Sequence, residues 1–276
     1  MFFVSKSLWL KFLSTLWQLK LWVVDATFMF TAHKNRLPDF LIIGVPKAGT
    51  TYLYHILNQH SKIQMSRRKE IHFFDKNYHR GKRYYRSFFP KSDLGMLTGE
   101  ASVNYFYSDK AKSRIERDLP NVKLILLLRN PADRAYSHFQ MNRKDMIEKS
   151  FDQHIASNSL EFKKYNYLEK GMYSKYISLW EEYLNDERLL IIKSEELFSD
   201  ERKVMQNVFN FLGMPQETLV ISPKKNSGNY EDISIQTRNK LMSFYNDDIS
   251  ELEKSLKVSF EWSTSGSQVN SEDGLK

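Results

Sequence analysis

Apolar residues along the chain follow two patterns, short continuous runs and longer segments with helical spacing. The continuous runs, which predict buried strands, lie at 39–44, 122–128 and 188–192. The segments with helical spacing predict helices at 51–59, from Pro131, at 173–184, at 204–212 and at 235–256. Strands that alternate with helices in this way predict an α/β fold, in which a central parallel sheet is flanked by helices on both faces.

The first 32 residues have helical periodicity as well, with large apolar side chains around one polar stripe. The stripe consists of Ser7, Lys11, Ser14, Gln18 and Asp25. Charged residues interrupt every window of the roughly 20 apolar residues that a membrane-spanning helix needs, and no small-residue cleavage site follows. Two interpretations of this amphipathic helix stay open: it lies on a membrane surface, or it docks on the rest of the chain or on a partner.

A polar break at 33–38 separates this segment from the first predicted strand. We expect an N-terminal helix and linker over 1–36, one folded domain over 37–262, and a disordered Ser-, Gly- and Asp-rich tail over 263–276. The chain has no cysteine, which excludes disulfides, thiolate metal sites and thiol nucleophiles and suits a reducing compartment. We expect a cytoplasmic protein, with membrane association through residues 1–32 left open.

The formal net charge of +8 favours anionic partners, and one loop has the form of an anion site. Gly44-Val-Pro-Lys-Ala-Gly-Thr-Thr-Tyr52 follows a predicted strand and opens a helix, where unpaired backbone N–H groups and the helix dipole attract phosphate. The candidate ligands are Lys47, Ala48, Gly49, Thr50, Thr51 and Tyr52. The loop is similar to a P-loop, but its lysine lies inside the loop instead of directly before Thr50. A glycine turn without a ligand is the alternative interpretation.

Cations stand where a metal-dependent nucleotide enzyme has acidic residues. A P-loop NTPase holds Mg²⁺ with the help of an acidic residue at the end of a neighbouring strand. Here the strands at 122–128 and 188–192 run into Arg129 and Lys193. We therefore predict a site that neutralises its nucleotide with side chains and requires no metal, which argues against an ATPase or a kinase.

A second anion site is predicted where the strand at 122–128 ends. Asn130 suits a helix N-cap and Pro131 the first helical position, so Arg129 lies at the carboxyl end of the strand. Ser137 projects from the same helical face as Asn130, so Arg129 and the Ser137 hydroxyl are placed to bind one phosphate. By itself Arg129 also suits a structural ion pair, but two anion sites at the strand ends of one sheet favour a nucleotide.

These two loops resemble those with which sulfotransferases bind PAPS, 3′-phosphoadenosine 5′-phosphosulfate: the first grips the 5′-phosphosulfate and the second the 3′-phosphate. Lys69-Glu-Ile-His-Phe-Phe-Asp75 and Gly99-Glu-Ala-Ser102 are similar to segments of the heparan sulfate (glycosaminoglycan) sulfotransferase branch. The resemblance covers most of residues 38–262 and implies a P-loop-like α/β fold. Because this chain lacks the disulfide and the membrane span of the animal enzymes, a bacterial member of the family is the better analogy.

The resemblance implies an enzyme that transfers a sulfuryl group from PAPS to a hydroxyl or amine of a carbohydrate-like acceptor and releases PAP. It implies that Glu70 takes the acceptor proton and that Lys47 stabilises the departing phosphate oxygen. A basic turn resembles the loop that closes over PAPS in this branch, and by itself also suits a plain solvated turn; it is made of Lys224, Lys225, Asn226, Ser227 and Gly228. Some relatives have a catalytic lysine where this chain has Ala101, so the acceptor and the sulfated position stay open.

Several assignments have competing interpretations. By itself Glu70 suits a surface ion pair with Arg67 or Arg68, and His72 is either a reserve base or a hydrogen-bonded structural histidine. An acceptor groove would be lined by basic side chains, which are otherwise solvated, and by tyrosines that stack on sugars, which are otherwise packed in the core. The basic residues are Arg67, Arg68, Arg80, Lys82 and Arg83, and the tyrosines are Tyr84, Tyr85, Tyr105 and Tyr107. The alternative functions are a nucleotide kinase-like enzyme, a basic nucleic-acid-binding protein and a donor-binding pseudoenzyme; we expect a carbohydrate or small-molecule acceptor and no nucleic acid.

Overall fold

The computed structural model describes residue 32 and residues 35–91, 95–143, 150–153, 166–218 and 232–262. Three predictions lie outside these residues: the helix before Ala32, the basic turn at Lys224–Gly228 and the tail from residue 263. Within the described ranges, every helix is too short or too polar to span a bilayer.

Five parallel strands form one sheet in the order β2-β3-β1-β4-β5. Their bounds are β1 Phe40–Gly44, β2 Ile63–Met65, β3 Leu97–Ala101, β4 Lys123–Leu128 and β5 Leu189–Lys193. All residues of β1, and all of β4 except Lys123, are buried. Strands covered on both faces are apolar throughout instead of alternating, which is why the continuous runs predict them. The predicted parallel sheet is confirmed.

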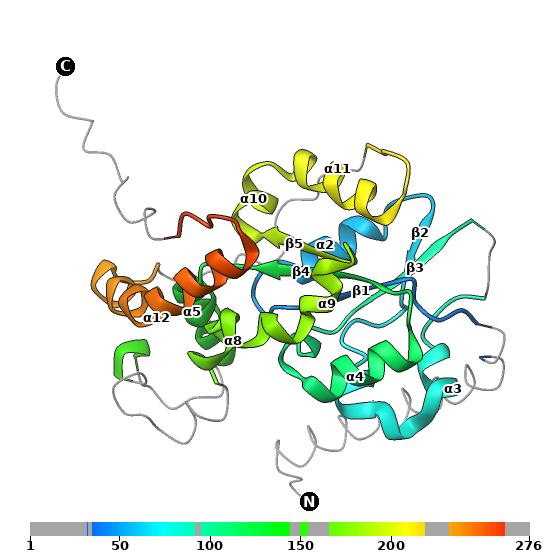
Figure 1. The fold of residues 1–276 in the computed structure, drawn as a ribbon, viewed down its shortest axis with the longest axis horizontal. Helices are drawn as coiled ribbons and strands as arrows, with labels where there is room; N and C mark the ends of the chain where they lie inside the picture. Colours follow the sequence, from blue (N-terminus) through cyan, green and yellow to red (C-terminus); the bar gives the residue numbers. More distant parts are fainter. Residues whose placement is uncertain are drawn as a thin grey trace, which may run out of the picture.

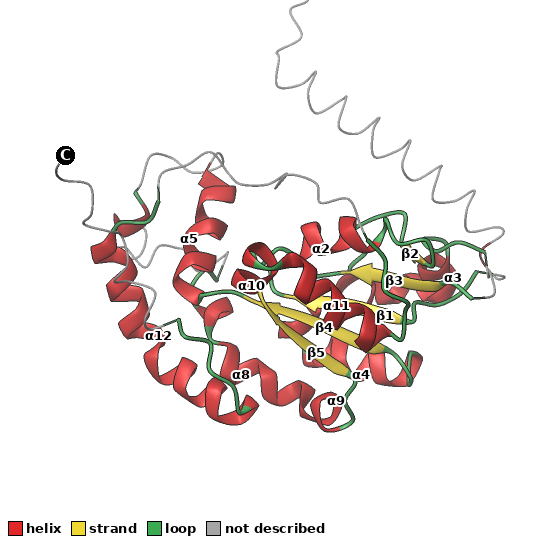
Figure 2. Ribbon diagram, turned by 90° about the horizontal axis from the view of Figure 1, so that it is seen from above, coloured by secondary structure: helices red, strands yellow, loops and turns green. Residues whose placement is uncertain are grey.

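Helices cover both faces of this sheet (Figures 1 and 2). One face carries α2 Thr50–Leu57, α10 Ser194–Ser199 and α11 Glu201–Leu212, and the other carries α4 Asp109–Asp118 and α9 Glu181–Asn185. At the side where β4 ends, α12 Ile235–Leu256 packs against α5 Pro131–Asn142 and α8 Tyr173–Ile177. The remaining helical segments are the π-helical turn η2 Phe73–Asn77, η3 Tyr78–Arg80, α3 Gly81–Arg86, η4 Tyr105–Tyr107, η6 Glu169–Gly171 and η7 Ser178–Trp180.

The structure differs from the sequence prediction at two strands, at one segment predicted as a single helix, and at the helices α3, α4 and α10, which the sequence does not predict. The sequence does not predict β2, which has three residues, or β3, in which Thr98, Gly99 and Glu100 interrupt the apolar run. The segment at 173–184, predicted as one helix, consists of α8, the turn η7 and α9. Its break lies at Trp180, which leaves the helical conformation (φ −109°, ψ 11°) and donates its indole N–H to the Phe106 carbonyl at 3.1 Å.

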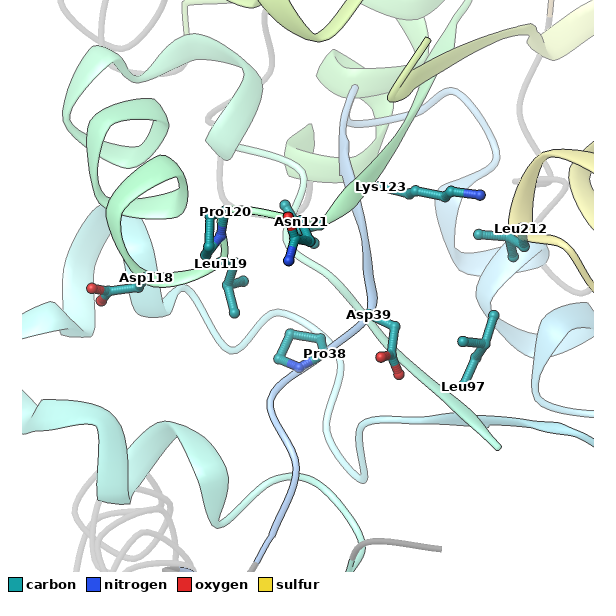
Figure 3. A pocket seen from close by; sticks show the side chains of 10 residues that line it. Pro38, Asp39, Leu97, Asp118, Leu119, Pro120, Asn121, Lys123 and Leu212 are labelled. Carbon is teal, nitrogen blue, oxygen red and sulfur yellow. The ribbon is translucent and has the colours of Figure 1, made fainter. Parts of the chain in front are cut away.

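A cavity of about 330 Å³ opens at the amino ends of β1, β3 and β4 (Figure 3). Its acidic side chains are already paired, because Asp39 accepts the Thr98 N–H at 2.7 Å and Asp118 binds Lys82 at 3.0 Å. Open α/β sheets bind their ligands at the carboxyl ends of the strands. The chemistry of this protein therefore has to be sought at the other edge of the sheet.

Candidate active site

The loop between β1 and α2 presents unpaired backbone donors. Among the described residues, no hydrogen bond uses the backbone N–H groups of Gly49, Thr50 or Thr51. These groups lie at the N-terminus of α2, where the helix dipole adds positive potential. Gly49 has φ +92°, and a Cβ there would meet the Phe198 ring at 3.0 Å, so only glycine suits the position. The arrangement fits a phosphate or sulfate group.

Lys47 adds a side-chain cation to this loop, and Arg129 joins it from the end of β4. The Arg129 guanidinium donates to the Lys47 carbonyl at 3.0 Å. Burial, and then the positive charge of Arg129, lower the pKa of the Lys47 ammonium. The ion pairs among the described residues include neither cation. Two adjacent cations without a carboxylate make this a place where an anion is stabilised.

The start of α5 has the predicted cap. The Asn130 side chain accepts the N–H groups of Ala132 at 3.0 Å and Asp133 at 3.3 Å, and Pro131 is the first helical residue. The cap holds α5 directly behind Arg129, whose carbonyl accepts the Tyr173 hydroxyl at 2.9 Å. Ser137 lies on α5 and is buried. The predicted members of the second anion site therefore come from the end of β4 and from α5.

Glu70 is linked to the anion-binding loop through Lys69. The Lys69 ammonium lies 2.6 Å from Glu70 Oε1 and 3.5 Å from the Thr50 hydroxyl. The other carboxylate oxygen of Glu70 accepts the Val103 N–H at 3.1 Å. A carboxylate held this close to the loop is placed to take a proton from a group that reacts there.

His72 lies between two carboxylates. Its Nδ1 is 3.0 Å from Asp75 Oδ2, and its Nε2 is 3.4 Å from Glu70 Oε2. Asp75 favours the tautomer with the proton on Nδ1, which turns the Nε2 lone pair toward Glu70. The imidazole is thus hydrogen-bonded, and it is also placed to exchange a proton with Glu70.

A second group of cations, which the sequence does not predict, lies beside α5. Lys170 donates to the Asn104 side chain at 3.3 Å, and the fully buried Arg134 donates to the Tyr167 carbonyl. Burial, followed by the charges of Arg134, Lys170 and Lys47, lowers the pKa of His138 to about 3. Positive potential therefore extends from Lys47 to Lys170. Lys170 belongs to no recognisable motif, and only the fold brings it here.

Tyr52 and the predicted sugar-stacking tyrosines have packing roles. The Tyr52 hydroxyl donates to the Glu201 carboxylate, and its ring lies 5.5 Å from that of Phe198, so its side chain joins α2 to α10 and α11. Tyr84, Tyr85 and Tyr105 are at most 2% exposed, which makes the sugar-stacking interpretation wrong for these three and confirms the packing alternative.

The model of the sulfotransferase domain family matches residues 37–253. The chain belongs to the sulfotransferase domain family. This match confirms the resemblance inferred from the two loops. A solved sulfotransferase from Alicyclobacillus acidocaldarius has the same fold, with a TM-score of 0.73 and 25% identity over 83% of this chain and 99% of that chain. The predicted P-loop-like α/β fold is confirmed as well.

Two curated relatives act on heparan sulfate according to their names. The chain is 32% identical to the bifunctional heparan sulfate N-deacetylase/N-sulfotransferase 1 of Xenopus laevis, over 80% of this chain and 30% of that protein. It is 31% identical to the heparan sulfate glucosamine 3-O-sulfotransferase 3B1 of Mus musculus, over 68% of this chain and 49% of that protein. The chain thus spans less than a third of the first relative and about half of the second.

Proposed function

We propose that this protein is a PAPS-dependent sulfotransferase, which transfers a sulfuryl group to a hydroxyl or amine of a carbohydrate acceptor and releases PAP. The observation that supports this most directly is the junction of Lys47 and Arg129. It joins the free N–H groups at the start of α2 to a second cation at the end of β4. The polyanionic donor matches this distribution of donors and positive charge.

The proposed reaction is an in-line displacement at sulfur. The acceptor oxygen or nitrogen forms a bond to sulfur while the bond from sulfur to the 5′-phosphate oxygen breaks, and PAP leaves with that electron pair. Glu70 takes the acceptor proton, which His72 can accept in turn through Nε2. Lys47 and the loop N–H groups stabilise the negative charge that develops on the departing oxygen.

The kinase alternative has less support because the strand ends carry cations. Arg129 follows β4, and Lys193 ends β5, where it pairs with Glu196 at 3.4 Å. A magnesium-dependent phosphoryl transferase has a free acidic residue in this region, whereas Glu196 is paired with Lys193 and Glu195 accepts the Asn130 N–H at 2.8 Å. Side chains of this protein supply the positive charge that the metal supplies in a kinase.

Calorimetric titration with PAP in the absence of magnesium, with ATP as the comparison ligand, tests the donor. We expect PAP to bind more tightly than ATP. Arg129→Ala should weaken PAP binding about tenfold or more, because a charge-assisted hydrogen-bond donor contributes roughly 1.5–3 kcal/mol. Arg202→Ala, at an exposed position of α11, is the matched control. Equal affinity for ATP and PAP, or no PAP binding, would contradict the proposal.

The acceptor is tested with two heparan-type oligosaccharides, one with free glucosamine amines and one with N-acetylated glucosamines. Transfer of labelled sulfate to the first alone indicates N-sulfation, and transfer to both indicates O-sulfation. PAP binding without transfer to these acceptors, or to a wider panel of hydroxyl compounds, would favour the pseudoenzyme.

A further inference from the structure

The carboxylate of Glu100 is fully buried at the end of β3 and accepts three hydroxyl groups. Oε1 accepts the hydroxyls of Tyr105 at 2.8 Å and Tyr85 at 3.0 Å, and Oε2 accepts that of Ser102 at 3.2 Å. A buried carboxylate is costly unless such donors surround it. The reaction described above does not use Glu100, so its presence in the core needs another reason.

Two of these hydroxyls hold the backbone of the segment that carries the base. The Ser102 hydroxyl accepts the His72 N–H at 3.0 Å. The Tyr105 hydroxyl accepts the N–H groups of Phe73 at 2.8 Å and Phe74 at 3.3 Å. Each hydroxyl has a single proton, and that proton goes to Glu100. Glu100 therefore orients both hydroxyls so that their lone pairs face residues 72–74.

The segment needs such support because two of its residues adopt left-handed backbone conformations. Glu70 has φ +61° and His72 has φ +51°. Residues other than glycine rarely adopt these angles, and the surroundings have to hold them there. The backbone of Glu70 is also held by the end of β3, because the Glu70 N–H donates to the Ala101 carbonyl at 3.1 Å.

We propose that Glu100 is the positioning residue for the base: as a carboxylate, it holds residues 72–74 through Ser102 and Tyr105, so that Glu70 stays beside Lys69 and Thr50. The inference rests on the proposed role of Glu70. A protonated Glu100 cannot accept all three hydroxyls in the same way, because one of its oxygens then carries a proton. Protonation therefore loosens the turn from which Glu70 projects.

The surroundings of Glu100 put this change near neutral pH. Burial raises the pKa of Glu100 to about 7; the hydroxyls of Tyr105, Tyr85 and Ser102 oppose the rise, and the charge of Glu70 adds to it. These groups come from η4, α3, the end of β3 and the segment before η2, and Tyr54 of α2 also lies in the field of Glu100. Transfer should therefore slow as the pH falls through about 7.

Glu100→Gln tests the proposal by hydrogen exchange and by kinetics, with the N-unsubstituted oligosaccharide as acceptor. We expect the amides of His72, Phe73 and Phe74 to exchange at least tenfold faster at one fixed pH. We expect kcat to fall about tenfold, while the Kd of PAP and the KM of the acceptor change less than twofold. The decline of kcat below neutral pH should disappear in this variant. A residue that only fills space would not change the pH profile.

Tyr85→Phe is the second variant, because the Tyr85 hydroxyl bonds to Glu100 and not to the backbone of residues 72–74, while phenylalanine keeps the ring that stacks on Phe73 at 4.3 Å. It removes one donor to the carboxylate, so the decline of kcat should move to higher pH while the plateau rate stays within twofold. It also keeps the test valid if Glu100→Gln does not fold. Wild-type amide exchange and kcat in Glu100→Gln, or an unshifted pH profile in Tyr85→Phe, would overturn the proposal. Failure of the wild type to bind PAP would instead contradict the proposed function, and amide exchange would still report on Glu100.

Discussion

The guanidinium of Arg129, after β4, donates to the backbone carbonyl of Lys47, in the loop after β1, at 3.0 Å. This bond joins the two anion sites that the sequence predicts separately. It fixes the backbone of a residue with φ +74°, and it places a second positive charge beside the Lys47 ammonium. The loop and the end of β4 therefore act as one structural unit, and a change in Arg129 reaches the Lys47 backbone as well as the proposed phosphate site.

Replacement of Lys47 should affect turnover more than donor binding. Lys47→Ala removes the ammonium that stabilises the departing oxygen, and the loss of one such donor costs about 3 kcal/mol in the transition state, or roughly 100-fold in kcat. In the intact donor this oxygen does not yet carry the charge that develops on departure, and the backbone N–H groups stay in place, so the Kd of PAPS should change much less. Single-turnover kinetics and calorimetry separate the two effects. Lys254→Ala, at an exposed position of α12, is the control, and a Kd that changes as much as kcat would contradict the assignment.

Replacement of Glu70 should strongly slow transfer and leave the donor site intact. Glu70→Gln keeps the shape of the side chain but cannot take a proton, so we expect kcat to fall by about 100-fold or more. The Asp75→Asn variant weakens the orientation of His72 and should have a smaller effect. Transfer assays combined with PAP titration check both. Activity of Glu70→Gln close to the wild-type level would assign the base to another residue, with His72 the first candidate.

Protonation of Glu100 should stabilise the fold while it slows the reaction. The folded-state pKa, about 7, lies above the ordinary value of 4.5, so the folded protein holds this proton more tightly than the unfolded chain does. The free energy of unfolding therefore gains about 3 kcal/mol from this group as the pH falls from above 7 to about 4.5. Denaturant unfolding of the wild type and of Glu100→Gln at several pH values isolates the contribution, and identical pH dependence would contradict it.

His138 should remain neutral across the physiological range. Its folded-state pKa, about 3, lies below the ordinary value of 6.5, so the unfolded chain takes the proton first. His138 therefore lowers the free energy of unfolding as the pH falls from about 6.5 to 3, which opposes the contribution of Glu100 over part of that range. The NMR signals of its imidazole should not shift between about pH 5 and 8. A titration of His138 within that interval would show that burial and the charges of Arg134 and Lys170 do not lower its pKa as described.

The Tyr52→Phe variant tests whether the Tyr52 hydroxyl contributes to donor binding or only to stability. Tyr52→Phe keeps the ring on Phe198 and removes the hydroxyl that donates to Glu201. We expect a loss of about 1 kcal/mol in the free energy of unfolding, typical of one partly buried hydrogen bond. The Kd of PAP should stay within twofold, because the Tyr52 hydroxyl donates to Glu201. A large increase in Kd would restore a direct role for the side chain.

Continuous apolar runs predict β1, β4 and β5, because strands covered on both faces need no polar positions. The loop from Lys47 to Thr51 and the cap at Asn130 follow from local rules for strand ends and helix starts. Such local rules do not predict β3. In the sequence Glu100 has the character of a surface residue, and only in the folded chain do Tyr85 and Tyr105 enclose it. Three hydroxyl donors, which lie close together only in the folded chain, decide whether this position belongs to the core.

The contacts of Lys170 and Lys69 at the candidate site could not be predicted from the sequence either. Lys69 directly precedes Glu70 in the sequence, but its approach to the Thr50 hydroxyl depends on the pairing of β3 with β1 and β2. Lys170 reaches Asn104 across a long separation in sequence, with no motif around it. The sequence predicts the residues whose chemistry depends on neighbours along the chain, and the fold supplies the others.

The bond between Asp133 and Arg238 has a consequence for the order of events during synthesis. Arg238 of α12 binds the Asp133 carboxylate through two nitrogens, each at 3.1 Å, in the first turn of α5. The helix that carries Ser137 is thus braced by a segment more than a hundred residues later in the chain. A ribosome-bound chain that has exposed both anion-binding loops still lacks this brace. The nucleotide pocket is completed only when α12 has left the exit tunnel, and a chain stopped before residue 235 should fold its sheet without gaining full affinity for PAP.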